Sequence, residues 1–124
     1  MDLPARKRLS HAIPPWVTEG SFYFLTINCE LRNENQLCRE NIGDEIFAAT
    51  GHNHEKSVWH CRLSLLMPNH LHAIIAFPPE PGIKTIVSNW KRFIATKCGV
   101  QWQRDFFDHR LRDQHELQAK ESSS

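Results

Sequence analysis

The sequence of 124 residues is long enough for one domain with a single hydrophobic core and too short for two. Its 40% hydrophobic and 23% charged residues are typical of a globular protein, and no apolar run approaches the roughly 20 residues that a membrane helix needs. The four cysteines are scattered without a C-x-x-C pair, which argues against a zinc ribbon and gives no support to a disulfide scaffold. The basic N-terminus lacks the apolar stretch of a secretory signal, so we expect a cytoplasmic protein with no membrane partner.

Charge is unevenly distributed along the chain, although the net charge is only +1. Residues 82–112 carry a net charge of +5, whereas residues 19–55 carry a net charge of −5. This asymmetry suggests one face that is suited to a polyanion. Two solvated faces that differ in charge would produce the same pattern, so charge alone leaves both interpretations open.

The chain begins with a basic arm and a strand. We expect residues 1–20 to form an extended N-terminal arm, because Arg6-Lys7-Arg8 is followed by two prolines that fit neither a helix nor a central strand. Residues 21–31 are rich in aromatic and β-branched residues and predict a strand. One face of this strand would carry Tyr23, Leu25, Ile27 and Cys29, and the other Phe22, Phe24, Thr26 and Asn28.

A helix is predicted over residues 40–50, with Gly51 as its end. The pair His52 and His54 would then lie in a loop, where nothing holds both rings on one side. We interpret this pair as solvated.

Residues 58–66 and 70–77 alternate in polarity and predict a hairpin. The first strand would place Trp59, Cys61, Leu63 and Leu65 on one face. A three-residue connection, Met67-Pro68-Asn69, pairs Leu65 with Leu71, Cys61 with Ile75 and Ser64 with His72. A two-residue connection would place Leu65 opposite His72 and break both faces, so we predict the longer connection.

The rest of the chain predicts a helix, a strand and a short last helix. Residues 83–98 are amphipathic and Gly99 ends this helix, residues 102–111 alternate as a strand, and Asp113 would cap the last helix. The order βαββαβ predicts an α+β, ferredoxin-like fold, a four-stranded antiparallel sheet with helices on one face. We place one domain at residues 21–121 and a tail at residues 122–124.

The sharpest chemical feature is the pair His70 and His72. Strand side chains alternate, so both imidazoles leave the sheet on the same side, where they could share one divalent cation. A metal there could polarise a phosphodiester. Two polar residues on the solvated face of a sheet would look identical, so the pair alone leaves metal binding open.

Several segments resemble those of the REP-associated tyrosine transposases, which are HUH-type single-tyrosine transposases similar to insertion-sequence transposases. The first is Met67-Pro68-Asn69-His70-Leu71-His72 with the apolar residues after it, and the second runs from Trp102 to Arg112. The strand at residues 22–26 and the Trp90-Lys91-Arg92 helix also fit. Together these segments cover nearly the whole chain in the right order.

The resemblance implies DNA transposition by a ferredoxin-like domain, usually a homodimer, that recognises single-stranded DNA hairpins such as REP-like palindromes. It further implies that His70 and His72 hold Mg²⁺ or Mn²⁺ on the scissile phosphate. In the family, a tyrosine on a helix after the Arg-rich strand becomes linked to the 5′-phosphate, and an Asn or Gln four residues later completes the metal site. Here the corresponding helix, from about Asp113, contains no tyrosine, and we expect no catalytic nucleophile in this chain.

A few other residues could belong either to the site or to the fold. Tyr23 is the only tyrosine, and we expect it in the core. His109 or Asp108 could supply a makeshift third metal ligand. Trp102 could stack on a base or lie in the core.

Phosphate contacts are expected from the basic residues of the arm, the second helix and the last strand. These candidates for DNA binding are Lys91, Arg92, Arg104, Arg110, Arg112, Arg6, Lys7 and Arg8. Arg110 and Arg112 share a strand face with Asp108, so ion pairing within the protein is an alternative for them.

Three functions follow from these patterns. The chain could be a DNA-cleaving transposase domain that is truncated or degenerate, or a hairpin-binding module that has lost cleavage. It could also be an unrelated ferredoxin-like metal-binding protein. A covalent adduct with DNA, or salt-dependent hairpin binding without one, would separate these possibilities.

Overall fold

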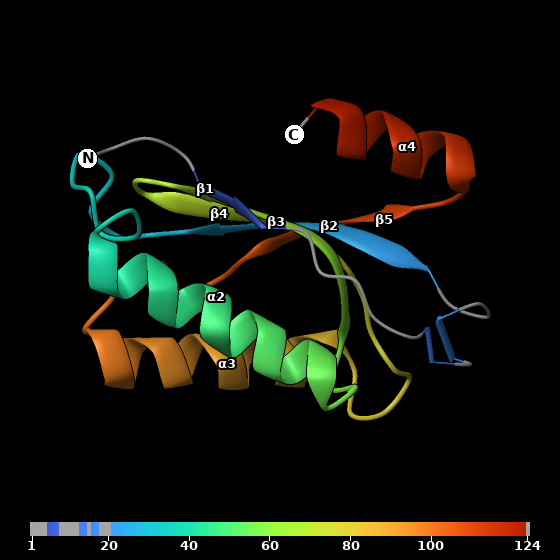
Figure 1. The fold of residues 1–124 in the computed structure, drawn as a ribbon, viewed down its shortest axis with the longest axis horizontal. Helices are drawn as coiled ribbons and strands as arrows, with labels where there is room; N and C mark the ends of the chain where they lie inside the picture. The colour runs from blue at the N-terminus through green and yellow to red at the C-terminus, as the bar shows by residue number, and fades with distance from the viewer. Residues whose placement is uncertain (1–4, 8–12, 15, 18–20, 124) are drawn as a thin grey trace.

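An antiparallel sheet forms the middle layer of the protein, with helices on both of its faces (Figure 1). The structure is a computed structural model that describes residues 5–7, 13–14, 16–17 and 21–123. The strands are β1 (Ala5–Lys7), β2 (Phe22–Asn28), β3 (His60–Met67), β4 (His70–Ala76) and β5 (Phe107–Leu111). The helices are α2 (Glu40–Glu55), α3 (Ile83–Cys98) and α4 (Gln114–Ser123).

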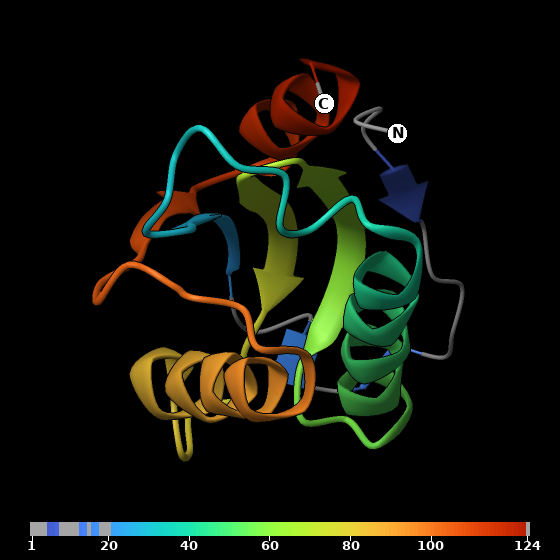
Figure 2. The ribbon, with the colours of Figure 1, turned by 90° about the vertical axis from the view of Figure 1, so that its left-hand side faces the viewer.

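The strand order in the sheet is β1-β3-β4-β2-β5. Without β1, the succession β2-α2-β3-β4-α3-β5 is the βαββαβ order of a ferredoxin-like sheet, and all pairings are antiparallel. The predicted fold class is therefore confirmed, and α2 and α3 lie on one face as expected, whereas α4 lies on the other face. β1 adds a short fifth strand beside β3, so residues 5–7 of the expected extended arm belong to the sheet (Figure 2). Arg8 lies outside the described residues.

The main core lies between the sheet and the helices α2 and α3, which run side by side below it (Figures 1 and 2). Apolar residues three or four positions apart give α3 a buried stripe, and Gly99 ends this helix with a φ of 74°, as predicted. The predicted face of β2 is also confirmed, since Leu25, Ile27 and Cys29 are all buried in this core.

A second, smaller core lies on the other face of the sheet, beneath α4. Leu63 and Ile74 from the central strands meet Leu111 and Leu117 there. Asp113 caps α4 as predicted, because the Glu116 backbone N–H donates to Asp113 Oδ1 at 2.9 Å. α4 extends to Ser123, so residues 122 and 123 are helical although we expected a tail.

The predicted hairpin register was wrong near the turn. Met67 pairs with His70 and Leu65 with His72, so the connection has only two residues, Pro68 and Asn69. An irregularity between Cys61 and Leu63 then shifts the register, which restores the predicted pairing of Cys61 with Ile75. Leu63 and Leu65 therefore lie on the face of His72, and this is favourable because the second core gives Leu63 an apolar environment there.

The predicted end of the first helix was also wrong. Gly51 lies inside α2, which continues to Glu55. The extra turn is held by packing, because Trp59 Nε1 donates to the Thr50 carbonyl and the Cys61 N–H donates to His54 Nδ1. His54 is therefore buried, whereas His52 is exposed as expected. These contacts outweigh the poor helix propensity of glycine.

The last strand is shorter than predicted. β5 covers Phe107–Leu111, and the preceding residues form a connector from α3 in which Trp102 makes an isolated bridge with Cys29.

Candidate metal and phosphate site

The two histidines His70 and His72 lie on β4 with one residue between them, so their side chains leave the sheet on the same face, as predicted. This is the face covered by α4, away from α2 and α3 (Figure 1). Their ring centroids are 4.8 Å apart, and both residues are partly exposed. Two imidazoles at this spacing can both reach one small ligand between them.

His70 is held in one tautomer by its neighbour Asn69. The Asn69 amide nitrogen donates to the Arg32 carbonyl, which leaves its Oδ1 to accept a 2.7 Å hydrogen bond from His70 Nδ1. Because a carboxamide oxygen can only accept, the proton of neutral His70 is on Nδ1. Nε2 therefore keeps its lone pair, which is the form that ligates metals.

His72 is held by contacts with β2 and α4. Its Nδ1 lies 3.1 Å from the Thr26 hydroxyl, in the cross-strand pair Thr26–His72. Its ring stacks on Phe24, with centroids 5.1 Å apart. The ammonium of Lys120, on α4, lies 4.8 Å from the centroid of the same Phe24 ring.

The environment keeps both imidazoles neutral. Burial lowers the pKa of His70, and the neighbouring His72 and the Arg32 guanidinium lower it further. Burial also lowers the pKa of His72, where hydrogen bonding with the Leu25 backbone opposes this effect and the charge of Lys120 adds to it. Since an unperturbed histidine titrates near 6.5, both rings are neutral at pH 7 and available as ligands.

His70 and His72 would supply only two protein ligands to a divalent cation. Within the part of the chain that the structure describes, no group of three His, Cys, Asp or Glu side chains could hold a metal ion. The makeshift third ligands suggested by the sequence are placed elsewhere. His109 Nε2 pairs with Glu116 at 3.0 Å, and Asp108 lies opposite Leu25 on the other face of the sheet.

Two cations next to the histidines were not predicted from the sequence. Arg32 hydrogen bonds to Asn28 Oδ1 at 2.6 Å and lies beside His70, whereas Lys120 lies beside His72. Their positive charges act on the two imidazoles and favour an anionic ligand beside them. The pairing of β2 with β4 brings Arg32 there, and the packing of α4 brings Lys120. Neither arrangement leaves a local signal in the sequence.

Lys91 and Arg92, which were predicted to bind DNA, lie on α3, on the face of the sheet opposite the histidines. Lys91 is only 9% exposed, and its ammonium donates to the carbonyls of Gln103 and Arg104 at 2.8 and 3.0 Å. This places Lys91 in the fold as a link between α3 and the connector. Arg92 is exposed on α3, and Arg104 is exposed in the connector.

The basic residues of the last strand and of the arm differ in their surroundings. Arg110 is exposed and its Nε donates to the Ser21 hydroxyl at 3.0 Å, while Arg112 is exposed just before α4. No ion pair joins either arginine to Asp108 among the residues that are described. Arg6 and Lys7 lie on β1, next to β3, and their side chains are outside the description.

The aromatic residues Tyr23 and Trp102 take part in the core. Tyr23 pairs with Ile75 across the sheet and its ring contacts Phe77, with centroids 6.2 Å apart, so it lies on the face opposite the histidines. Trp102 is partly buried against Trp90, and its Nε1 donates to the Lys91 carbonyl at 3.1 Å. Both positions favour the core alternatives over catalysis and base stacking.

Comparisons with known proteins identify similar structures. No family model matches the sequence, and no curated protein matches it. A REP-associated tyrosine transposase, solved bound to a REP hairpin, is similar over 82% of this chain and 62% of its own length, with a TM-score of 0.69 and 19% sequence identity. A protein of Deinococcus radiodurans R1 assigned as a transposase is similar over 94% of this chain and 95% of its own, with a TM-score of 0.59 and 12% identity.

The chain thus spans less than two thirds of the first of these proteins. None of the described helices has the length and apolar character to cross a membrane. The fold of this chain is that of the REP-associated tyrosine transposase and of the Deinococcus protein.

Proposed function

We propose that this chain is a DNA-binding domain of the transposase type, which holds a phosphate of single-stranded hairpin DNA at His70 and His72 together with Mg²⁺ or Mn²⁺. The observation that supports this most directly is the pair of neutral imidazoles on one face, 4.8 Å apart and flanked by Arg32 and Lys120. The similar REP-associated transposase was solved with a REP hairpin, which makes hairpin DNA the first ligand to test.

The metal would be held by the Nε2 atoms of His70 and His72. When bound, it would supply a Lewis acid that polarises a phosphodiester. The chain's own residues orient these ligands: Asn69 fixes the tautomer of His70, and Thr26 and Phe24 hold the ring of His72. Arg32 and Lys120 would contact the phosphate oxygens and neutralise part of their charge.

Metal binding is tested by titrating Mn²⁺ and following the free ion by electron paramagnetic resonance. We expect weak binding, because two imidazoles leave most coordination positions to water. His72→Ala should abolish it, whereas His52→Ala, which removes an exposed histidine from α2, should not change it. Equal affinities in the wild type and His72→Ala would remove the histidine pair from the metal site.

DNA binding is tested with a labelled hairpin over a range of salt concentrations. Each phosphate contact contributes roughly 0.7 to the slope of log K against log salt for a single strand. Arg32→Met and Lys120→Met should each reduce the slope by about that amount. The matched control is Lys84→Met, which removes an exposed cation from α3 on the opposite side of the sheet.

We further propose that these 124 residues bind DNA without forming a covalent adduct. Tyr23 is the only tyrosine in the sequence, and the sheet separates it from the histidines. Incubation with labelled hairpin DNA and Mn²⁺ should therefore give no shifted band on a denaturing gel. A band that disappears in Tyr23→Phe would identify Tyr23 as the nucleophile, and a band that persists would refute the tyrosine mechanism.

Of the functions considered from the sequence, we therefore propose for this chain the module that binds hairpin DNA without cleaving it. The resemblance to the transposases also suggests a homodimer, which light scattering after gel filtration tests with and without hairpin DNA.

A further inference from the structure

Three tryptophan rings lie next to one another in the core between the sheet and the helices, tilted against each other, and one of them has no hydrogen-bond partner among the described residues. Trp59 and Trp90 have ring centroids 5.9 Å apart, and those of Trp90 and Trp102 are 5.6 Å apart. Trp59 Nε1 donates to the Thr50 carbonyl and Trp102 Nε1 to the Lys91 carbonyl, each at 3.1 Å. Trp90 is only 3% exposed, yet its Nε1 has no acceptor among the described residues. A buried donor without an acceptor is rare in native proteins and calls for an explanation.

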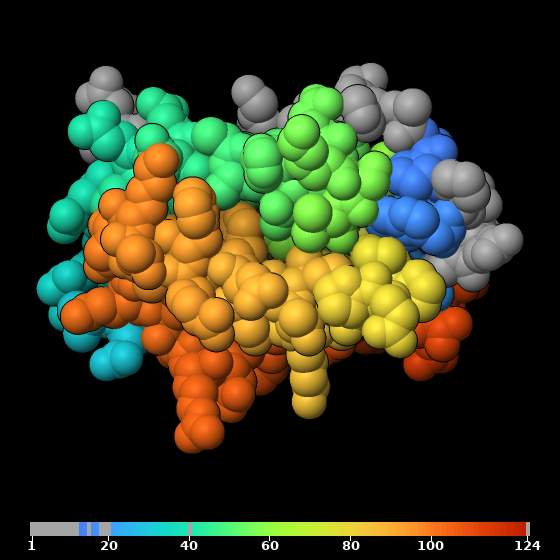
Figure 3. Space-filling model, turned by 90° about the horizontal axis from the view of Figure 1, so that it is seen from below, coloured from blue at the N-terminus to red at the C-terminus, as the bar shows by residue number. Residues whose placement is uncertain are grey.

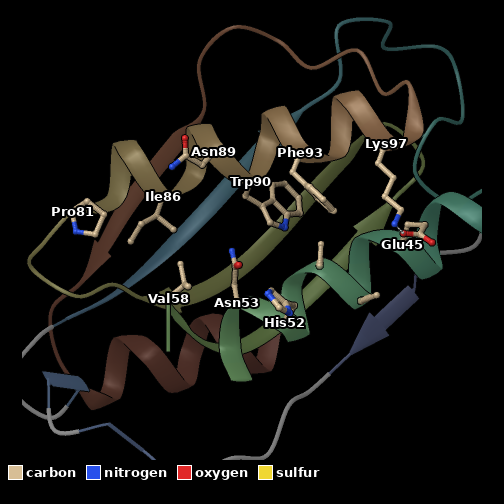
Figure 4. A pocket seen from close by; sticks show the side chains of 12 residues that line it. Glu45, His52, Asn53, Val58, Pro81, Ile86, Asn89, Trp90, Phe93 and Lys97 are labelled. Atoms are coloured by element: carbon tan, nitrogen blue, oxygen red, sulfur yellow. Dashed lines mark ion pairs between the residues drawn. The ribbon is translucent and has the colours of Figure 1, made fainter. Parts of the chain in front are cut away.

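Trp90 lines a groove between α2 and α3, on the outer side of the helices. The cavity volume is about 670 Å³, within the range of roughly 300–1,000 Å³ that is usual for small-molecule sites. Figure 4 shows the indole of Trp90 extending from α3 toward α2, with its nitrogen directed at the groove. Figure 3 shows this face of the molecule, where the green atoms of α2 and the yellow and orange atoms of α3 adjoin.

The walls of the groove are mainly apolar and carry little net charge. Ala48 and Ala49 from α2 face Ile86 and Phe93 from α3. At one end Lys97 and Glu45 form an ion pair of 3.2 Å across the groove, so their charges largely cancel (Figure 4). A charged ligand would gain little from such walls and would lose hydration, whereas an uncharged apolar ligand would bury hydrocarbon against them.

Apolar side chains at the rim of the groove are exposed to solvent. Phe93 is 50% exposed and Val58 is 37% exposed, and both line the groove. Trp90 Nε1 lies beneath the surface, so a ligand atom reaches it only when a lining side chain turns aside. We expect Phe93 to be that side chain, because its ring is half exposed and lines the groove.

We propose that this groove binds an uncharged, mainly apolar small molecule that bears one carbonyl oxygen, which accepts a hydrogen bond from Trp90 Nε1. The apolar part of the ligand covers Ile86 and Phe93. The site is independent of the function proposed above, because the sheet separates it from His70 and His72.

The test uses 6-propionyl-2-(dimethylamino)naphthalene, an uncharged naphthalene ketone whose emission responds to polarity and hydrogen bonding. We expect saturable binding with a shifted emission and quenching of tryptophan fluorescence. Trp90→Phe keeps an aromatic ring, although a smaller one, and removes the N–H donor, so it should weaken binding by about 5- to 10-fold. The matched ligand without the ketone should bind the wild type and Trp90→Phe equally.

A second variant and a competition separate the outcomes. Ala48 is exposed on the rim, so Ala48→Phe should fill the groove and abolish binding of both naphthalenes without disturbing the core. Urea unfolding of each variant shows that it is folded. No saturable binding to the wild type, or equal ketone affinity in Trp90→Phe, would overturn the proposal. Displacement of the ketone by hairpin DNA would also overturn it, because the groove would then belong to the DNA-binding surface.

Discussion

Replacing Lys91 with methionine tests whether this residue serves the fold or the DNA. Methionine retains most of the apolar stem but removes the ammonium, which donates two hydrogen bonds to the carbonyls of Gln103 and Arg104. Hydrogen bonds from a charged donor contribute roughly 1.5–3 kcal/mol each, and the cost of burying the charge offsets part of this. We therefore expect Lys91→Met to lower the free energy of unfolding by about 2–4 kcal/mol.

The assay is urea unfolding followed by tryptophan fluorescence, with hairpin binding measured on the same proteins. The control is Lys84→Met on the same helix, where the side chain is exposed and the change should stay within about 0.5 kcal/mol. Lys91→Met should also leave the salt dependence of DNA binding unchanged at temperatures where it is folded. Equal stability of the two variants, together with a reduced salt slope for Lys91→Met, would refute the structural role of Lys91.

Three further predictions concern the backbone, the buried thiols and the last helix. Gly51→Ala should stabilise the protein by about 0.5–1 kcal/mol, because Gly51 is helical and a Cβ there meets nothing within 4 Å. Gly99→Ala should destabilise it, because the φ of Gly99 is +74°. Thermal unfolding of both variants checks this, and a loss of stability in Gly51→Ala would contradict it. Burial raises the pKa of Cys29 to about 11 and of Cys61 to about 12 from 9.0. The unfolded chain therefore loses these protons at lower pH than the folded protein, and the free energy of unfolding should fall as the pH rises from about 9. This fall should be shallower in Cys61→Ala, and parallel curves for the two proteins would contradict the raised pKa of Cys61. Asp113→Ala should cost about 1 kcal/mol and loosen α4, which hydrogen exchange detects as faster exchange of the Glu116 amide; unchanged exchange would mean that the cap contributes nothing.

Alternation and helical periodicity predicted most of the fold, because they depend on neighbouring residues. The faces of β2 and the whole of α3 follow from such local patterns. The register of the β3–β4 hairpin could not be predicted from local patterns, because the irregularity between Cys61 and Leu63 moves Leu63 to the other face of the sheet. That shift is favourable only because α4, more than 40 positions later in the chain, supplies a second core.

The candidate site was predicted only in its local part. A spacing of two residues on a strand was enough to place His70 and His72 on one face. Arg32 and Lys120 come from a loop and a helix that reach the histidines through tertiary packing, so composition and periodicity do not reveal them. The burial of Lys91 was not apparent from the sequence for a related reason. A lysine on the polar side of a helix gives the same pattern whether its ammonium is in water or bonds to the carbonyls of a distant segment.

The two edges of the sheet differ in how they discourage association with other molecules. β3 is rich in leucine and would present a flat row of unpaired backbone groups, but β1 pairs with Leu66, Leu65 and Ser64 and covers part of it. At the other edge, β5 exposes Asp108, His109 and Arg110 in succession. Charged side chains on an edge strand oppose its pairing with a strand of another molecule. Sheet extension leading to aggregation is therefore hindered at one edge by the shortness of the edge strand β1, which has three residues, and at the other edge by charge.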